Sequence, residues 1–369
     1  MYDFFDKFSA TVHPTGPAPT IKTFLFFIIF DKVFNISFKT PPEDDSGVAH
    51  IMEHSVLCGS RKYPVKEPFV ELMKGSLNTF LNAMTYPDKT IYPVASRNHK
   101  DYQNLVDVYL DAVFFPTLSK EAFEQEGWHY EVGEDGLSYK GVVFNEMKGV
   151  FSSPESYLDY SLNKVLFSDS TYGYESGGYP EAIPNLSYDE YLKFHDEKYH
   201  RSNSWIILYG DIDRDYWLDY LDKEYLGQFD PPDFPLPVIQ KQTLKNAPEE
   251  VFCKYPSAAE DNGDMSLMSI SFLTGDILDI EKNFAMGVLD VILIGSAGSP
   301  LKKALLESGL GEDTLDYGYG NETLQTNWSV GLRDTRPENK QAFVDLVLTE
   351  LKKYSEEGLP EKMVQAALN

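Results

Sequence analysis

The sequence predicts an α+β fold made of two related domains in tandem, each a sheet with helices packed on one face. The chain has 369 residues, of which 42% are hydrophobic, enough for two domains with a core each. A motif of the form Ile-Ser-Phe-x-Thr occurs twice, at residues 36–40 and 270–274. In both places an apolar run typical of a strand precedes a pattern typical of a helix, which indicates an internal repeat.

A proline-rich stretch separates the two predicted domains. Residues 229–238, FDPPDFPLPV, contain four prolines, and such a stretch suits a linker better than a helix or a central strand. We therefore predict a first domain over residues 1–228, a linker over 229–248 and a second domain over 249–369.

The chain is strongly acidic. It has 58 Asp and Glu residues against 32 Lys and Arg residues, which gives a formal charge of -26. This excess argues against a nucleic-acid partner and favours a basic ligand, although a solvated acidic surface explains the same charge. Two cysteines, Cys58 and Cys253, are too few for a disulfide scaffold and indicate a reducing compartment.

The most apolar run of the sequence is FLFFIIF, at residues 24–30. It is too short to cross a bilayer, and the preceding MYDFFDKF lacks the positive charge of a signal or transit peptide. We expect no membrane partner and a soluble, intracellular protein of the cytoplasm or the mitochondrial matrix, without a recognisable targeting segment. We predict that residues 24–38 form one or two buried strands.

The sequence HIMEH gives the clearest sign of chemistry. The surrounding GVAHIMEHSVL is compatible with a helix that Asp45 or Ser46 caps at its start and Gly59 closes at its end. On a helix, His50 and His54 lie one turn apart on the same face, where two imidazoles can bind one metal ion.

Glu53 falls on the same helical face as the two histidines. Zinc needs a third protein ligand and an open position for water, and the best candidate for that ligand is Glu146, in KGVVFNEMKG. In such a site zinc polarises the water and the substrate carbonyl, while Glu53 accepts a proton from the water and later delivers one to the leaving amine. The alternative is that His50 and His54 are ordinary surface or core histidines.

Four motifs, in order, resemble one family: TPPEDDSGVAHIMEHSVLCGSRKYPVKEPF, SLNTFLNAMTYPDKTIYPVAS, EGWHYE and KGVVFNEMKG. They are similar to the presequence protease branch of the pitrilysin-like inverzincins, zinc metallopeptidases of family M16, subfamily C, that carry H-x-x-E-H. Carried over residue by residue, the resemblance implies one zinc ion per chain, with His50, His54 and Glu146 as ligands and Glu53 as the general base.

The resemblance also implies a fold and a substrate. Members of the family consist of homologous α/β roll domains, usually four, in two halves that close around a chamber. They hydrolyse unstructured peptides such as cleaved presequences, which are basic, and an edge strand beside the zinc binds the peptide through main-chain hydrogen bonds.

In this chain, SLNTFLNAMTYPDKTIYPV predicts two strands joined at Pro87 and Asp88, the first of which corresponds to the edge strand. Asn82 and Ala83 are our candidates for the peptide contact. An ordinary hairpin whose apolar side chains fill the core is the alternative.

The remaining pattern predicts the order of the elements. In the first domain we expect helices near residues 99–113 and 119–132, then the helix of Glu146, and a last strand near WIILYG. In the second domain we expect helices at 337–356 and from residue 360 onward, so that the chain ends inside the repeat and the second domain is truncated. We therefore expect that a C-terminal half, which closes the chamber in relatives, is missing or is supplied by a separate chain.

Two functions follow from these observations. The first is a zinc-dependent endopeptidase, or the N-terminal catalytic half of one. The second is a non-catalytic, peptidase-like subunit that binds peptides or scaffolds a partner. The presence of the two histidines together with Glu53 and Glu146 favours the enzyme, because a structural relative has no physical need of all four.

Overall fold

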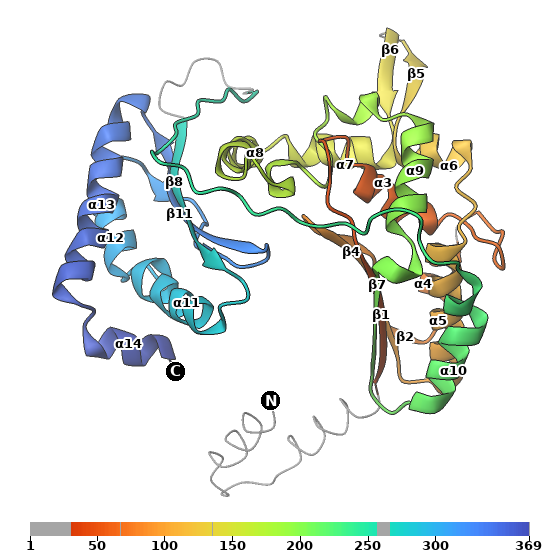
Figure 1. Ribbon diagram of the computed structural model, residues 1–369. Coiled ribbons are helices and arrows are strands. Elements are labelled where there is room, and N and C mark those ends of the chain that lie inside the picture. Colours follow the sequence, from red (N-terminus) through yellow and green to blue (C-terminus); the bar gives the residue numbers. More distant parts are fainter. Residues whose placement is uncertain (1–30, 67, 135, 257–265, 369) are drawn as a thin grey trace, which may run out of the picture.

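The computed structural model describes residues 31–66, 68–134, 136–256 and 266–368, and Figure 1 shows two larger sheets flanked by helices, together with the two-stranded sheet of β5 and β6. The predicted mixture of helices and strands is confirmed. The elements of the first part, here called the first domain, are β1 (Lys32–Lys39), α3 (Val48–Val56), α4 (Pro68–Gly75), β2 (Asn78–Leu81), β3 (Met84–Thr85), β4 (Lys89–Ser96), α5 (His99–Phe114), α6 (Lys120–Glu126), β5 (His129–Gly133), β6 (Gly136–Lys140), α7 (Val142–Val150), α8 (Pro154–Leu166), η1 (Thr171–Gly173), η2 (Ile183–Asn185), α9 (Tyr188–Lys198), η3 (Arg201–Asn203), β7 (Ser204–Tyr209), α10 (Arg214–Glu224) and η4 (Leu226–Gln228).

The second part of the chain, here called the second domain, follows the same order of elements as the beginning of the first. A strand and two helices come first, then short strands and a long strand, then two helices. These elements are β8 (Ser266–Asp276), α11 (Ile280–Ile294), α12 (Pro300–Glu307), β9 (Asp313–Thr314), β10 (Tyr319–Gly320), β11 (Gln325–Thr335), η5 (Pro337–Asn339), α13 (Lys340–Glu357) and α14 (Glu361–Leu368).

The sheet of the first domain is antiparallel, with the strand order β2-β4-β1-β7 and with β3 paired to β4. In β1, Phe34, Ile36 and Phe38 are fully buried, and the residues between them are partly exposed. This alternation gives the sheet one covered and one open face. The predicted strand is therefore present from Lys32, and residues 24–30 of that prediction lie outside the described residues.

Helices cover one face of this sheet. Met52 of α3, Tyr109 of α5, Tyr191 of α9 and Trp217 of α10 share one buried cluster with the apolar residues of β1 and β4, and Figure 1 shows these helices beside the strands. The predicted helix near 99–113 is confirmed as α5. The helix predicted over 119–132 is shorter, because Gly127 caps α6 and the next strand begins at once. No helix in the described part of the chain is long and apolar enough to cross a membrane.

The sheet of the second domain has the order β10-β11-β8, with β9 also paired to β11. Its core is separate and contains Trp328 of β11, Leu305 of α12 and Phe343 of α13. The two predicted helices near the end of the chain are confirmed as α13 and α14. β8 is followed by α11 as β1 is followed by α3, so the repeat seen in the sequence is also present in the structure.

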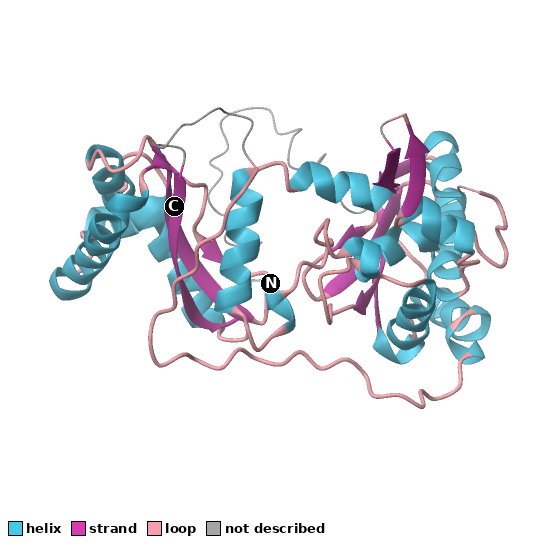
Figure 2. Ribbon diagram, turned by 90° about the horizontal axis from the view of Figure 1, so that it is seen from above, coloured by secondary structure: helices cyan, strands magenta, loops and turns pink. Residues whose placement is uncertain are grey.

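The chain between η4 and β8 has no helix or strand among its described residues, 229–256. Figure 2 shows these described residues as a long loop that runs from the helices of the first domain to the second domain. This loop includes the predicted linker, residues 229–248. The domain boundaries that we set at 228 and 249 remain a prediction.

Candidate metal centre

The helix of the HIMEH motif, α3, begins differently from our prediction. Its N-cap is Gly47, in the left-handed conformation with φ 69°, and no side chain caps the helix, so the prediction of Asp45 or Ser46 as the cap is wrong. Asp45 instead accepts a hydrogen bond of 2.6 Å from the ammonium of Lys164 on α8. At its other end α3 stops before Gly59, which adopts φ 131° in the following loop.

A close approach of two backbone segments explains the glycine at the start of α3. A Cβ on Gly47 would lie 2.7 Å from the carbonyl oxygen of Gly177 and 2.7 Å from the Cα of Gly178. The same carbonyl oxygen is 3.1 Å from Nδ1 of His50. The missing side chain therefore lets residues 177–178 reach the helix and present a hydrogen-bond acceptor to the first histidine of the motif.

Helices α3 and α7 bring the three predicted ligands together. The donor atoms of His50, His54 and Glu146 all lie within 4.8 Å of one another. Oε2 of Glu146 is 3.8 Å from Nε2 of His50 and 3.9 Å from Nε2 of His54. A tetrahedral zinc ion with bonds of about 2.1 Å separates its ligand atoms by about 3.4 Å, so a small inward movement would complete the site. The group is therefore able to hold a metal ion.

Each histidine has a partner on the ring nitrogen that faces away from this centre. Nδ1 of His50 donates to the carbonyl of Gly177, and Nδ1 of His54 lies 3.2 Å from the carboxylate of Glu126 on α6. These contacts favour the tautomer in which Nε2 carries the free lone pair. Metal-ligating histidines usually have such outer partners, because the partner orients the ring and increases its basicity.

The charges around the second histidine favour a cation. Burial opposes protonation of His54, but the hydrogen bond to Glu126 and the charges of Glu53, Glu126 and Glu146 outweigh it and raise the pKa of the ring. For Glu126, burial raises the pKa, but the hydrogen bonds from His54 and Gln125 outweigh burial and lower the pKa overall. Glu126 is therefore a carboxylate near neutral pH.

Glu53 has a different environment from the three predicted ligands. Its side chain is 7% exposed, and its Oε2 accepts a hydrogen bond of 2.7 Å from the hydroxyl of Thr85 on β3. Glu53 is not among the three residues whose donor atoms converge. The carboxylate is therefore held from the neighbouring hairpin, beside the metal-ligand group.

The hairpin that supplies Thr85 matches the prediction in outline. Strands β3 and β4 flank a turn at Pro87 and Asp88, and β2 forms an edge of the sheet. Asn82 and Ala83 lie between β2 and β3. Asn82 already donates its N–H to Pro93, and its side chain accepts from the N–H of Ala83.

The backbone N–H groups of Asn82 and Ala83, our candidates for the peptide contact, therefore already have hydrogen-bond acceptors. A bound peptide would have to displace the side chain of Asn82 to reach the N–H of Ala83. The role of Asn82 and Ala83 in peptide binding therefore remains a prediction.

The sequence reasoning missed Glu126, Thr85 and Gly177 as members of this site. Glu126 lies in EGWHYE, a motif that we noticed, but no spacing relates it to His54. Gly177 could have been suspected only from the pair of glycines at 177–178. All three act through contacts between segments that are distant in the sequence, which a periodic pattern does not reveal.

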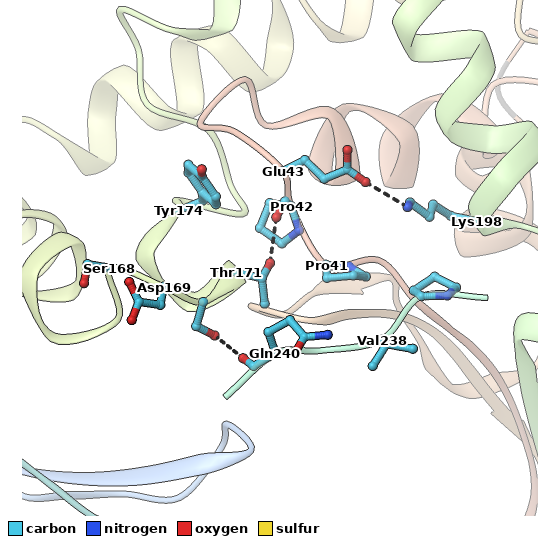
Figure 3. A pocket seen from close by; sticks show the side chains of 12 residues that line it. Pro41, Pro42, Glu43, Ser168, Asp169, Thr171, Tyr174, Lys198, Val238 and Gln240 are labelled. Atoms are coloured by element: carbon cyan, nitrogen blue, oxygen red, sulfur yellow. Dashed lines mark hydrogen bonds and ion pairs between the residues drawn. The ribbon is translucent and has the colours of Figure 1, made fainter. Parts of the chain in front are cut away.

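A cavity of about 430 Å³ lies elsewhere in the first domain and shares no lining residue with the group of His50, His54 and Glu146. It is bounded by residues 41–43, residues 168–174 and the linker at 237–240. Figure 3 shows Glu43 paired with Lys198 at one side, at 3.1 Å, and Thr171 bonded to the carbonyl of Pro42. The cavity thus lies where the linker crosses the first domain.

Two family models match the chain. The model described as Insulinase (Peptidase family M16) matches residues 40–148, which include all four predicted zinc-site residues. The model described as Peptidase M16 inactive domain matches residues 185–369. The second match begins before α9 of the first domain and includes the whole second domain, where α11 has Phe284, Gly287 and Val288 at the positions that correspond to His50, Glu53 and His54.

Curated relatives are similar over most of the chain. Presequence protease 1, chloroplastic/mitochondrial, of Arabidopsis thaliana is 49% identical over 348 residues, which cover 92% of this chain and 32% of the relative. Protein HypA of Clostridium perfringens is 47% identical over 343 residues, with 92% and 35% covered. The mitochondrial presequence protease of Mus musculus is 38% identical over 347 residues, with 92% and 33% covered. The chain therefore spans about a third of the length of these relatives.

Solved structures with low sequence identity have the same fold. A protease from Helicobacter pylori has a TM-score of 0.68 at 15% identity, with 91% of this chain and 78% of that chain covered. Pitrilysin has a TM-score of 0.58 at 16% identity, with 90% and 35% covered. These similarities confirm the predicted fold class of tandem α/β roll domains.

Proposed function

Because the chain belongs to peptidase family M16, we propose that it is a zinc-dependent endopeptidase, or the catalytic part of one, that hydrolyses unstructured peptides. One observation carries this proposal: the donor atoms of His50, His54 and Glu146 converge, whereas Glu53 is held separately by Thr85. A base must stay close to the metal-bound water without being a ligand itself, and separate anchoring provides this arrangement.

We assign the zinc ligands to His50, His54 and Glu146. Two imidazole nitrogens and a carboxylate are a donor set that Zn²⁺ prefers in catalytic sites, and the side chain of Glu146 is 51% exposed, so one side of the group is open. When bound, zinc would supply a polarised water molecule and a polarised substrate carbonyl. The contacts of the histidines with Gly177 and Glu126 keep both Nε2 atoms directed at Glu146.

Glu53 is the proposed general base. Oε2 accepts the hydrogen bond from Thr85, and the other oxygen would accept a proton from the water that attacks the peptide carbonyl carbon. The same carboxyl group then delivers the proton to the amine nitrogen as the C–N bond breaks. The products are a free carboxylate and a free amine, as in any peptide hydrolysis.

The substrate is proposed to be an extended, basic peptide. β2 is an edge strand, so a peptide without structure of its own can add to it through main-chain hydrogen bonds near Asn82 and Ala83. The formal charge of -26 favours basic sequences, and several relatives are named presequence proteases. Since the chain spans about a third of these relatives, we propose that further segments, from the same or a separate chain, complete the substrate chamber. The relatives' names include mitochondrial and chloroplastic, and for this chain we propose the mitochondrial matrix or the cytoplasm.

The decisive experiment compares Glu53→Gln with Glu71→Gln, which removes an exposed carboxylate on α4. Glu53→Gln should bind about one zinc ion per chain with unchanged affinity but lose peptide hydrolysis, because an amide does not accept the proton. Glu71→Gln should retain both properties. Loss of zinc by Glu53→Gln would show that Glu53 is a ligand and would overturn the assignment.

A second experiment tests the substrate class. Fluorescent peptides of equal length, basic or acidic and without stable structure, are titrated at increasing salt, with a folded protein as the control. The basic peptide should bind most tightly, and salt should weaken its binding, because the attraction is electrostatic. Equal binding of the acidic peptide or of the folded protein would contradict the proposal.

The alternative, a non-catalytic subunit, is not favoured by the comparisons. The matched relatives include presequence proteases, and the site contains the full set of two histidines and two glutamates on α3 and α7. In the second domain α11 has no histidine, and Phe284, Gly287 and Val288 stand at the positions that correspond to His50, Glu53 and His54.

A further inference from the structure

Tyr172 of η1 joins the two domains through its hydroxyl group. The hydroxyl donates a hydrogen bond of 2.7 Å to the carboxylate of Asp88 in the turn between β3 and β4. It also accepts a hydrogen bond of 2.9 Å from the backbone N–H of Leu324, in the loop before β11 of the second domain. Tyr172 is 4% exposed, so water competes little for either bond. One hydroxyl therefore links the turn of the first domain to the second domain.

The turn that Tyr172 contacts is the turn that positions Thr85. Thr85 is opposite Thr90 across the hairpin, and the N–H of Tyr86 donates to the carbonyl of Lys89, which closes the turn around Asp88. Asp88, which contacts Tyr172, and Thr85, which contacts Glu53, are thus only three residues apart in one tight hairpin. A displacement of the turn would therefore change the direction of the Thr85 hydroxyl.

Gln242 of the linker makes further hydrogen bonds to both domains, next to the contact between Tyr172 and Leu324. Gln242 of the linker is 4% exposed, and its side chain accepts a hydrogen bond of 2.7 Å from the N–H of Asp169, just before η1. Its backbone carbonyl accepts a hydrogen bond of 3.1 Å from the side chain of Gln325, the residue after Leu324. The linker, the segment before η1 and the start of β11 therefore meet at one joint, formed by residues 169–172, 242 and 324–325. The cavity of Figure 3 borders this joint, since Asp169 and Thr171 line it.

We propose that Tyr172 is a positioning residue through which the second domain holds the general base of the first. Contact of Leu324 with Tyr172 fixes Asp88, the fixed turn holds Thr85, and Thr85 orients Glu53. The inference rests on the proposed function for the role of Glu53. The connection from Leu324 to the hairpin depends only on the two hydrogen bonds of the Tyr172 hydroxyl. The second domain would then contribute to catalysis, although its described residues, 266–368, contain no group of potential metal ligands.

The test compares Tyr172→Phe with Tyr317→Phe in the full chain. Tyr317 also joins the two domains, through a hydrogen bond to Asp159 of α8, but this bond does not involve the hairpin. Amide hydrogen exchange is measured for a peptide that covers residues 84–90. Tyr172→Phe should increase exchange of this peptide about three- to tenfold, the range expected for one lost hydrogen bond, and Tyr317→Phe should not.

A second variant separates the domain contact from the contact within the first domain. Leu324→Pro removes the N–H donor and leaves Tyr172 and Asp88 in place, and a thermal unfolding transition shows whether the variant folds. A folded Leu324→Pro protein should show faster exchange over residues 84–90, as Tyr172→Phe does. If its exchange there equals that of the wild type, or if Tyr172→Phe has no effect, the coupling is wrong.

Zinc affinity and kinetics then connect the hairpin to the base. In Tyr172→Phe, zinc affinity should remain unchanged and kcat for a peptide should fall about three- to tenfold with little change in KM. Weaker zinc binding in this variant would contradict a role through Glu53. If Glu53→Gln proves as active as the wild type, the proposed function fails, and the exchange experiment still decides whether the second domain holds the hairpin.

Discussion

Thr85 and Glu53 meet across two elements, the short strand β3 and the helix α3, through a hydrogen bond of 2.7 Å. Glu53 is 7% exposed and Thr85 is partly buried, so water has limited access to the bond. A hydrogen bond to a carboxylate in such surroundings is stronger than one between neutral groups at the surface. Thr85 therefore restricts the carboxylate to one orientation.

Thr85→Val should reduce kcat about tenfold with little change in KM or in zinc content, because a misdirected base transfers the proton less often. The methyl group of valine replaces the hydroxyl at nearly the same volume. Thr90→Val is the matched control. Thr90 lies in the same hairpin as Thr85, but its hydroxyl bonds to Thr40, after β1, and not to Glu53. Equal losses of kcat in both variants would indicate a general effect on the hairpin.

Glu126→Gln should weaken zinc binding about tenfold to a hundredfold, because the outer carboxylate orients His54 and increases its basicity. Competition with a chelator of known affinity measures the effect. Glu124→Gln on the same helix is the control, as its side chain pairs with Lys120 at the surface. Unchanged affinity in Glu126→Gln would show that the contact is incidental.

Gly47→Ala should destabilise the protein by about 2 kcal/mol or more, since alanine is strained at φ 69° and its Cβ would clash with residues 177–178. Zinc binding should weaken as well, because the carbonyl of Gly177 holds His50. Gly287→Ala in α11 is the control: nothing lies within 4 Å of its Cβ, and alanine should stabilise this helix by up to about 1 kcal/mol. Denaturant unfolding distinguishes the two.

Asp107 of α5 is a candidate for acid sensitivity. Burial raises the pKa of its carboxyl group, but hydrogen bonds from Lys62, Tyr220, Tyr225 and Tyr63 outweigh burial and lower the pKa to about 2. A carboxyl group with a lowered pKa stabilises the fold above its ordinary pKa of 3.8, and this contribution disappears as the pH falls toward 2.

Asp107→Asn should therefore reduce the free energy of unfolding by about 1.5–3 kcal/mol near pH 7, the range for hydrogen bonds to a charged group. The difference between wild type and variant should shrink between about pH 4 and pH 2, because the wild type loses its carboxylate there. Asp215→Asn, at an exposed pair with Arg214, is the control. A difference that does not change with pH would show that the charge of Asp107 contributes nothing.

The sequence predicted those parts of the fold and site that depend on local pattern. The period of β1 and the spacing of His50 and His54 each follow from a single segment, and the strand and the helix were predicted in place. The N-cap of α3 was predicted wrongly. Gly47 is required there because Gly177, which lies far away in the sequence, approaches it closely. Thr85 was missed for the same reason.

The joint at Gln242 has a consequence for a proteolytic cut in the loop between η4 and β8. Past Gln242 the loop between η4 and β8 is described as far as residue 256, and Val251 and Phe252 of this loop are 43% and 77% exposed, so this part is open to a protease. A nick at these residues would leave the contacts of Gln242, Tyr172 and Leu324 intact. The two fragments should then migrate together on a native gel and separate only when denatured, as a complex of two chains made from one.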